Sequence, residues 1–267
     1  MKPPRVLYKY ESLATQSLAN LKSQIVYFGS PLQFNDPYDC AINPSIESPS
    51  DEELDAMRNS YLKKPDLPSS ARIEFETYDY PQLREIFVRS ARNALNNGVQ
   101  DFLKTKGVVC FTERNDDLLM WSHYGGKYKG FCLEFNTSAE LFQKVKPVRY
   151  VRTIPSISVT SILNDHGSVF SDLFCTKSDA WSYEKEWRAI HKVAGTEFGY
   201  PSDALAGVYF GPDIDRQSLE IVCLILAGQN ENVRLWRGSR STSEFKVLFE
   251  EFTYTSHLDA KRKGIIK

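Results

Sequence analysis

The sequence predicts an α+β fold, a single domain over residues 1–267 with a mixed or antiparallel sheet core and a helical insertion at residues 43–106. About eight runs of strand length, apolar or alternating, are interspersed with helical patterns and predict the sheet. Residues 43–106 differ in composition, with acidic and proline-rich pieces around helical patterns. The chain has 267 residues and is 42% hydrophobic, which is enough for one sizeable core.

The front of the chain predicts a strand, a helix and a second strand. Residues 6–10 form the first strand, leucines on one side predict a helix over residues 12–22, and residues 25–28 return as the second strand. This strand ends at Gly29-Ser30-Pro31. The loop at residues 34–39, Phe-Asn-Asp-Pro-Tyr-Asp, is rich in turn formers and predicts a rigid turn, whose acids and amide could also line a site.

The insertion is predicted to be helical and could act as a lid over a cleft. Ser50 or Asp51 could cap a helix that reaches Tyr61, because short polar side chains accept hydrogen bonds from the first N–H groups of a helix. A longer helix is predicted from Pro81 to Leu95, where apolar residues recur at helical spacing. None of these side chains indicates a particular chemistry.

A histidine stands in a dense polar and aromatic stretch, Met-Trp-Ser-His-Tyr-Gly-Gly at residues 120–126. The glycine pair allows a turn before the next predicted strand at residues 130–135, so His123 and Tyr124 would stand at the rim of the sheet. A histidine there could be an acid, a base or a binding group near neutral pH. A histidine beside a tryptophan is more often a hydrogen-bonded structural residue, and both interpretations stay open.

Further runs complete the predicted core. In the strand at residues 130–135, Glu134 lies between Leu133 and Phe135 and would point to the opposite face, toward solvent or a cleft. The remaining predicted elements are a buried strand at 107–112, a strand at 144–151, a helix at 157–174 interrupted near 165–167, a strand at 207–211, a helix from about Asp213, and closing strands at 233–237 and 244–254.

The densest group of charges lies in Trp-Ser-Tyr-Glu-Lys-Glu-Trp-Arg at residues 181–188. If this segment is extended, Glu184, Glu186 and Arg188 share one face, so that two acids share one cation. If it is helical, Glu184 and Arg188 form an i,i+4 ion pair and Glu186 points elsewhere. The alternating residues 189–193 favour the strand. A solvated charged edge beside core aromatics is the structural alternative.

Charge and cysteine content narrow the function classes. The net charge of −1 gives no electrostatic footprint for binding along a nucleic-acid backbone, so nucleic acid is possible only as a substrate. The five cysteines are odd in number and far apart, which indicates buried, reduced thiols in a cytoplasmic protein. No cysteine or histidine pair has zinc-ligand spacing, so no metal site is predicted. No signal peptide or membrane-length apolar run is present, so no membrane partner is expected. A small-molecule ligand is the expected partner, and the existence of a protein partner stays open.

Five motifs together resemble a bacterial family known as domain-of-unknown-function family 2971. The resemblance spans nearly the whole chain outside the insertion. The motifs are Leu7-Tyr8-Lys9-Tyr10, Phe34-Asn35-Asp36-Pro37-Tyr38-Asp39, Met120-Trp121-Ser122-His123-Tyr124 with Gly130-Phe131-Cys132-Leu133-Glu134-Phe135, Tyr183-Glu184-Lys185-Glu186-Trp187-Arg188, and Val208-Tyr209-Phe210-Gly211. The resemblance implies a bacterial, cytoplasmic protein, with antiphage defence or toxin settings as an association. It implies no activity.

A second resemblance suggests chemistry. Glu184-Lys185-Glu186 is similar to the Glu-x-Glu pair of the arginine-serine-glutamate class of ADP-ribosyltransferases, which implies NAD as cofactor. Glu186 would stabilise the oxocarbenium-like centre that forms when the glycosidic bond of NAD breaks, and Glu184 would orient or deprotonate the acceptor. The first strand offers Tyr8, Lys9 and Tyr10 where that class has an arginine, and its serine-threonine-serine element is reduced to Ser30.

The predicted site combines both sources. The catalytic residues would be Glu186, Glu184 and His123, and the cofactor-binding residues would be Tyr8, Ser30, Asn35, Asp36, Tyr124 and Arg188.

Two other functions are compatible with the same residues. In a metal-dependent hydrolase or nuclease, carboxylates would converge on a divalent cation; these are Asp36, Asp39, Glu134, Glu184 and Glu186. In a non-catalytic sensor or interaction module, Arg188 would neutralise both glutamates within a structural polar network.

Overall fold

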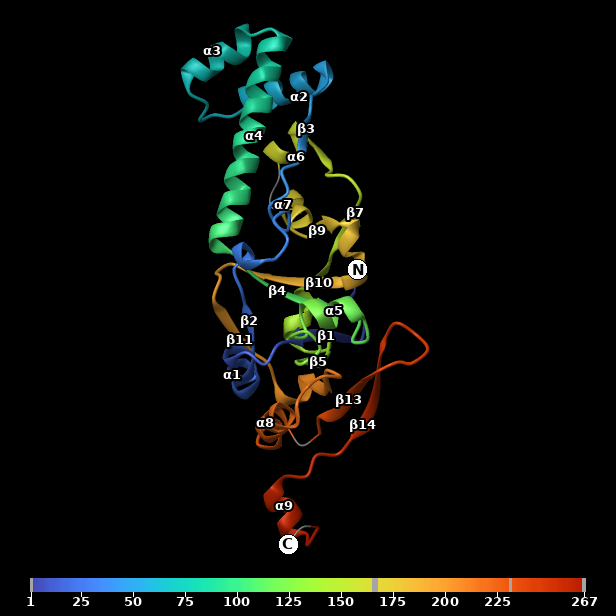
Figure 1. Cartoon of the computed structure of the whole chain (residues 1–267). Coiled ribbons are helices and arrows are strands. Elements are labelled where there is room, and N and C mark those ends of the chain that lie inside the picture. Colours follow the sequence, from blue (N-terminus) through green and yellow to red (C-terminus); the bar gives the residue numbers. More distant parts are fainter. Residues whose placement is uncertain (1, 165–167, 231, 266–267) are drawn as a thin grey trace. The chain divides into compact units, whose positions relative to one another are not determined.

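The computed structural model describes residues 2–164, 168–230 and 232–265 (Figure 1). Contacts within the chain gather into two compact units. Unit 1 comprises residues 1–30, 107–148 and 180–267, and unit 2 comprises residues 31–106 and 149–179. The α+β class with a mixed sheet is confirmed. Residues 43–106, predicted as an insertion, belong to unit 2, and their role as a lid stays a prediction.

Unit 1 is built on an eight-stranded sheet of order β14-β13-β12-β5-β1-β4-β10-β6. Only the β12–β13 pair within it is parallel, so the sheet is mixed but mainly antiparallel. Its strands are β1 (Val6–Glu11), β4 (Gly107–Thr112), β5 (Phe131–Asn136), β6 (Lys146–Pro147), β10 (Glu186–His191), β12 (Leu205–Phe210), β13 (Arg234–Arg240) and β14 (Val247–Phe252). A separate antiparallel pair joins β2 (Ile25–Phe28) to β11 (Thr196–Gly199).

The two faces of this sheet differ in chemistry because side chains alternate along each strand. One face carries the main apolar core, including Leu7, Phe135 and Trp187. The other face carries an aromatic cluster that includes Tyr10, Trp121 and Tyr209, together with the polar residues described below. The helices of unit 1 are α1 (Thr15–Ser23), α5 (Leu118–His123), α8 (Arg216–Ala227) and α9 (His257–Arg262), and its short 3-10 turns are η2 (Glu140–Lys144), η3 (Asp179–Glu184) and η4 (Ser202–Ala204).

Unit 2 is mainly helical and has its own apolar core, which includes Leu54, Leu83 and Phe87. Figure 1 shows α4 as its longest helix, with α2 and α3 beside the first turns of α4. Its elements are η1 (Pro31–Gln33), α2 (Asp51–Leu62), α3 (Ser69–Thr77), α4 (Tyr80–Thr105), α6 (Val159–Leu163), α7 (Ser168–Leu173), and the parallel pairs β3 (Ser45–Glu47) with β8 (Ser156–Ser158) and β7 (Arg149–Val151) with β9 (Thr176–Ser178).

Local capping explains where the helices of unit 2 begin. Ser50 and Glu53 form a reciprocal capping box at the start of α2, which confirms Ser50 as the cap. Helix α4 continues ten residues beyond the predicted end at Leu95, through Gly98. A Cβ at Gly98 would lie 2.2 Å from the ring of Phe170, so that ring would have to shift to admit a larger residue. The predicted break near residues 165–167 lies outside the described residues. No helix among those described is both long and apolar enough to cross a bilayer.

Candidate functional site

A row of residues in register crosses the second face of the sheet in unit 1. Thr112 of β4 is the cross-strand partner of both Tyr8 in β1 and Glu186 in β10. On the other side, Tyr8 is opposite Glu134, and Glu134 is opposite Gly207. Residues opposite each other in neighbouring strands point to the same face. We call this set the polar row; in order along the sheet it is Arg234, Gly207, Glu134, Tyr8, Thr112 and Glu186.

At one end of the polar row, Arg188 donates hydrogen bonds to both carboxylate oxygens of Glu186. Its Nε donates to Oε1 at 2.6 Å and its Nη2 donates to Oε2 at 3.0 Å. The pair is two residues apart on one strand, so both side chains project from the same face, as the alternation predicts. The exposed fractions of the two side chains are 0% and 5%. This is therefore a closed ion pair of the strong, bidentate kind.

Glu184 does not share the strand with Glu186, which corrects the expected extended segment. It is the last residue of η3, and Lys185 then takes a left-handed conformation with φ of 44° before β10 begins. The buried Glu184 carboxylate accepts a 2.6 Å hydrogen bond from the Tyr124 hydroxyl, and its carbonyl accepts one from Thr112 Oγ1 at 2.5 Å. Tyr124 thus holds the Glu184 carboxylate, and Arg188 holds the Glu186 carboxylate.

His123 and Tyr124 stand at the end of the short helix α5. Asp117 caps this helix by accepting from the N–H groups of Leu119 and Met120. The exposed His123 ring makes edge contacts with Trp181 and Tyr124, with ring centroids 6.2 Å apart in both cases. Tyr124, by contrast, reaches the Glu184 carboxylate. Of the two, Tyr124 has the direct polar link to a predicted catalytic carboxylate.

The remaining predicted site residues are divided between the two units. Ser30 is the last residue of the first segment of unit 1, whereas Asn35 and Asp36 belong to unit 2. Asp36 Oδ1 accepts from Tyr38 N at 2.9 Å, and its carbonyl accepts from Asp39 N at 3.0 Å. This is the rigid Asx-type turn that the sequence predicts. Within unit 1 the structure brings together Tyr8, Tyr124, Glu184, Glu186 and Arg188 on or beside the polar row.

A second polar group, which the predicted site omits, surrounds Glu134. Its Oε2 accepts from the Tyr209 hydroxyl at 2.5 Å, and its Oε1 accepts from Arg234 Nη2 at 3.1 Å. Tyr8 packs edge-on against Tyr209, with ring centroids 5.8 Å apart. Burial, and then the nearby Glu134 charge, raise the pKa of Tyr8 to about 12. Burial and the hydrogen bond to Glu134 raise the pKa of Tyr209 as well. Both phenols are therefore protonated donors at neutral pH.

A cavity of about 680 Å³ opens at the Glu134 end of the polar row, within unit 1. It lies where β1 and β13 begin and β5 ends, and a bulge between Leu205 and Gly207 starts β12 beside it. Its charged lining consists of Lys2, Arg5, Arg234 and Glu134. One feature of the sequence pointed to Glu134, its position between two apolar residues that face the other way. No feature of the sequence pointed to Arg234.

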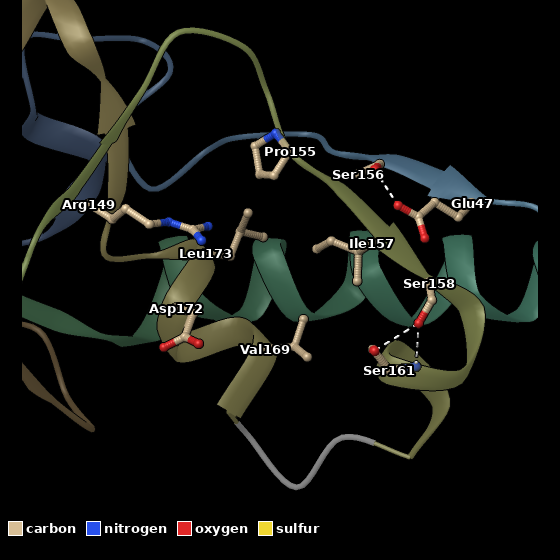
Figure 2. A pocket seen from close by; sticks show the side chains of 10 residues that line it. All are labelled: Glu47, Arg149, Pro155, Ser156, Ile157, Ser158, Ser161, Val169, Asp172 and Leu173. Carbon is tan, nitrogen blue, oxygen red and sulfur yellow. Dashed lines mark hydrogen bonds between the residues drawn. The ribbon is translucent and has the colours of Figure 1, made fainter.

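A smaller cavity of about 350 Å³ lies within unit 2 (Figure 2). Figure 2 shows Arg149 and Asp172 at one end and the serines with Glu47 at the other. Ser156 donates to Glu47, and Ser158 donates to Ser161 at 2.8 Å. The serine hydroxyls drawn there are thus engaged with neighbouring residues.

The described residues contain no group of three or more histidine, cysteine, aspartate or glutamate side chains placed to hold a metal ion. The carboxylates considered for a metal site have other partners: Glu134 has Tyr209 and Arg234, Glu184 has Tyr124, and Asp39 pairs with Lys177 at 3.2 Å. All five cysteines are free thiols.

Comparisons with known proteins bear on the segment that carries most of these residues. No curated protein and no solved structure matches the chain. Residues 120–189, which include Tyr124, Glu134, Glu184, Glu186 and Arg188, match the model of a family described as a protein of unknown function (DUF2971), which confirms over this segment the family that the motifs indicate.

Proposed function

We propose that this chain is an NAD-consuming, ADP-ribosyltransferase-like enzyme that works on the polar face of the unit 1 sheet. One observation carries the proposal: Tyr8 of the first strand and Glu186 of a late strand both pair with Thr112. The two side chains are two strand spacings apart, roughly 10 Å. The ADP-ribosyltransferase resemblance requires a first-strand side chain and a late-strand glutamate to face one site, and this register supports that requirement.

The geometry suggests a division of work between the two glutamates. When the glycosidic bond of NAD breaks, nicotinamide leaves with the bonding electrons and the ribose carbon becomes positively charged. A carboxylate that is fixed in advance and shielded from water stabilises such a centre strongly. Glu186 is fixed by Arg188 and is 5% exposed. Glu184, held by Tyr124, would accept the proton of the attacking water or acceptor hydroxyl.

The setting that goes with this proposal is a bacterial cytoplasm, in which consumption of NAD would act as a toxin or an antiphage response. NAD is the substrate, and an acceptor of the ADP-ribose group, nucleic acid included, would be the second partner. The family resemblance supports this setting. NAD levels are expected to fall in cells that express the wild-type chain. They should not fall in cells that express the Glu184→Gln variant.

A second candidate is a non-catalytic module, and one observation favours it. Arg188 is fully buried and holds both oxygens of Glu186, as a structural ion pair does. Under this alternative, Glu186→Gln lowers the melting temperature and no NAD chemistry exists to be lost.

The purified full chain incubated with NAD tests the proposal, with nicotinamide release measured by chromatography. The wild-type chain is expected to release nicotinamide, and Glu184→Gln to slow release by about a hundredfold or more. The glutamine oxygen still accepts from Tyr124, so this variant is expected to keep the wild-type melting temperature. Glu197→Gln, at an exposed glutamate of β11, is the matched control and should leave the rate unchanged. No nicotinamide release by the wild type would overturn the proposal.

A further inference from the structure

The cavity at the Glu134 end of the polar row has a charge distribution that indicates its ligand. Three cationic side chains, Lys2, Arg5 and Arg234, line it with a single carboxylate, Glu134. That carboxylate already accepts from Arg234 and Tyr209, so its charge is partly compensated within the protein. A volume of about 680 Å³ is in the range of small-molecule sites. The surplus of positive charge therefore favours an anionic ligand of this size.

Two hydrogen bonds fix the backbone on the side of the cavity that holds Arg5. The Arg5 carbonyl accepts from Thr137 N at 3.0 Å, and Thr137 Oγ1 donates to the Pro4 carbonyl at 2.5 Å. These two bonds fasten the start of β1 to the residue that follows β5. The exposed Arg5 side chain is thus anchored at its base while its guanidinium can reach a ligand.

Arg234 reaches Glu134 across β12, at the position of Gly207. Gly207 stands between Arg234 of β13 and Glu134 of β5 in the polar row. A Cβ at Gly207 would lie 3.6 Å from Glu134 Oε2, an ordinary van der Waals contact. The Arg234 side chain is 52% exposed, and a guanidinium has five N–H donors. Its exposed edge can therefore bind a second anion while it stays on Glu134.

The lining around these charges suits a phosphorylated nucleoside. Asn136 and Gln143 can hydrogen-bond hydroxyl or base groups, and Val6 offers apolar surface. Arginine binds phosphate oxygens with two parallel hydrogen bonds, which makes it the preferred residue for such groups. Both phenols beside Glu134 are neutral donors at physiological pH, so they add no negative charge.

We infer that this strand-end cavity is a binding site for a nucleoside phosphate, in which Arg234 and Arg5 hold the phosphate and Glu134 positions Arg234. The inference concerns binding alone and does not depend on NAD cleavage.

Isothermal titration of the full chain with AMP tests the inference, with adenosine and inorganic phosphate as partial probes. AMP is expected to bind, and Arg5→Gln and Arg234→Gln are each expected to weaken it by about tenfold or more, which corresponds to about 1.4 kcal/mol. Adenosine should bind far more weakly than AMP. Arg237→Gln, at an exposed arginine of the same strand that does not line the cavity, is the matched control and should leave AMP affinity unchanged.

Three outcomes would overturn the inference: no AMP binding at millimolar concentration, equal affinity for adenosine and AMP, or equal losses in Arg237→Gln and Arg5→Gln. Arg5→Gln keeps the test decisive if Arg234→Gln fails to fold, because the Arg5 side chain is exposed while its carbonyl accepts from Thr137 N. A chain that binds AMP but releases no nicotinamide would refute the proposed function and leave this inference standing.

Discussion

Two arginine–glutamate pairs lie toward opposite ends of the polar row. They have the same chemistry but differ in strand position, in the number of hydrogen bonds and in exposure. Glu186 and Arg188 are neighbours on one strand and meet through two hydrogen bonds, with exposed side-chain fractions of 5% and 0%. Glu134 and Arg234 come from strands separated by Gly207 and meet through a single hydrogen bond, with exposed fractions of 5% and 52%. The first pair is closed to solvent, and the second opens on a cavity.

This difference in exposure indicates that one pair is suited to holding a carboxylate in a fixed place and the other to exchanging an anionic partner. Removing one member of a closed pair leaves a charge in a low-dielectric interior, which costs much more than the pair contributes by itself. An arginine that is half-exposed keeps most of its hydration, so it can gain or lose an anionic partner at little cost. Glu186–Arg188 therefore holds a carboxylate in a fixed place, whereas Glu134–Arg234 can take up a ligand.

The largest expected effect comes from breaking the closed pair. Arg188→Gln would leave the Glu186 carboxylate buried without its guanidinium, and the free energy of unfolding should fall by about 3–5 kcal/mol. Urea unfolding followed by circular dichroism measures this loss. The double variant Arg188→Met with Glu186→Leu removes both charges and should recover much of the stability, as buried pairs replaced by apolar residues do. A double variant no more stable than Arg188→Gln would contradict the closed-pair interpretation.

The same change at the open pair should cost much less. Arg234→Gln removes a cation whose side chain is 52% exposed, and Tyr209 continues to donate to Glu134. The free energy of unfolding should fall by about 1 kcal/mol or less, measured in the same urea titration. If Arg188→Gln and Arg234→Gln cost equal amounts, exposure does not distinguish the two pairs and the comparison fails.

Period-two alternation predicted that Glu186 and Arg188 share one face, because they are two residues apart in a segment that alternates. It also predicted that Glu134 faces away from Leu133 and Phe135. The sequence could not predict that Glu184 leaves the strand, because the turn depends on Lys185, a non-glycine residue in the left-handed region.

The open pair depends on strand order, which alternation does not encode. Glu134 meets Arg234 only because β12 pairs with both β5 and β13. In the same way, Tyr8 and Glu186 share a row because β4 lies between β1 and β10. Pairings between distant segments arise from the packing of the whole sheet, so local patterns leave them undetermined.

The last expected effect concerns the phenol between the two pairs. The pKa of Tyr8 is raised from 10.0 to about 12, chiefly by burial and then by the Glu134 charge. Above pH 10 the unfolded chain loses this proton while the folded chain keeps it. This contribution to stability is therefore fully present below pH 10 and is lost as the pH rises to about 12. Tyr8→Phe should make the decline of the free energy of unfolding between pH 10 and 12 shallower, measured by urea titration at each pH. Tyr27→Phe, at an exposed tyrosine of β2, is the matched control and should keep the wild-type slope. Equal slopes for Tyr8→Phe and the wild type would show that Tyr8 titrates alike in both states and that the Glu134 charge does not reach it.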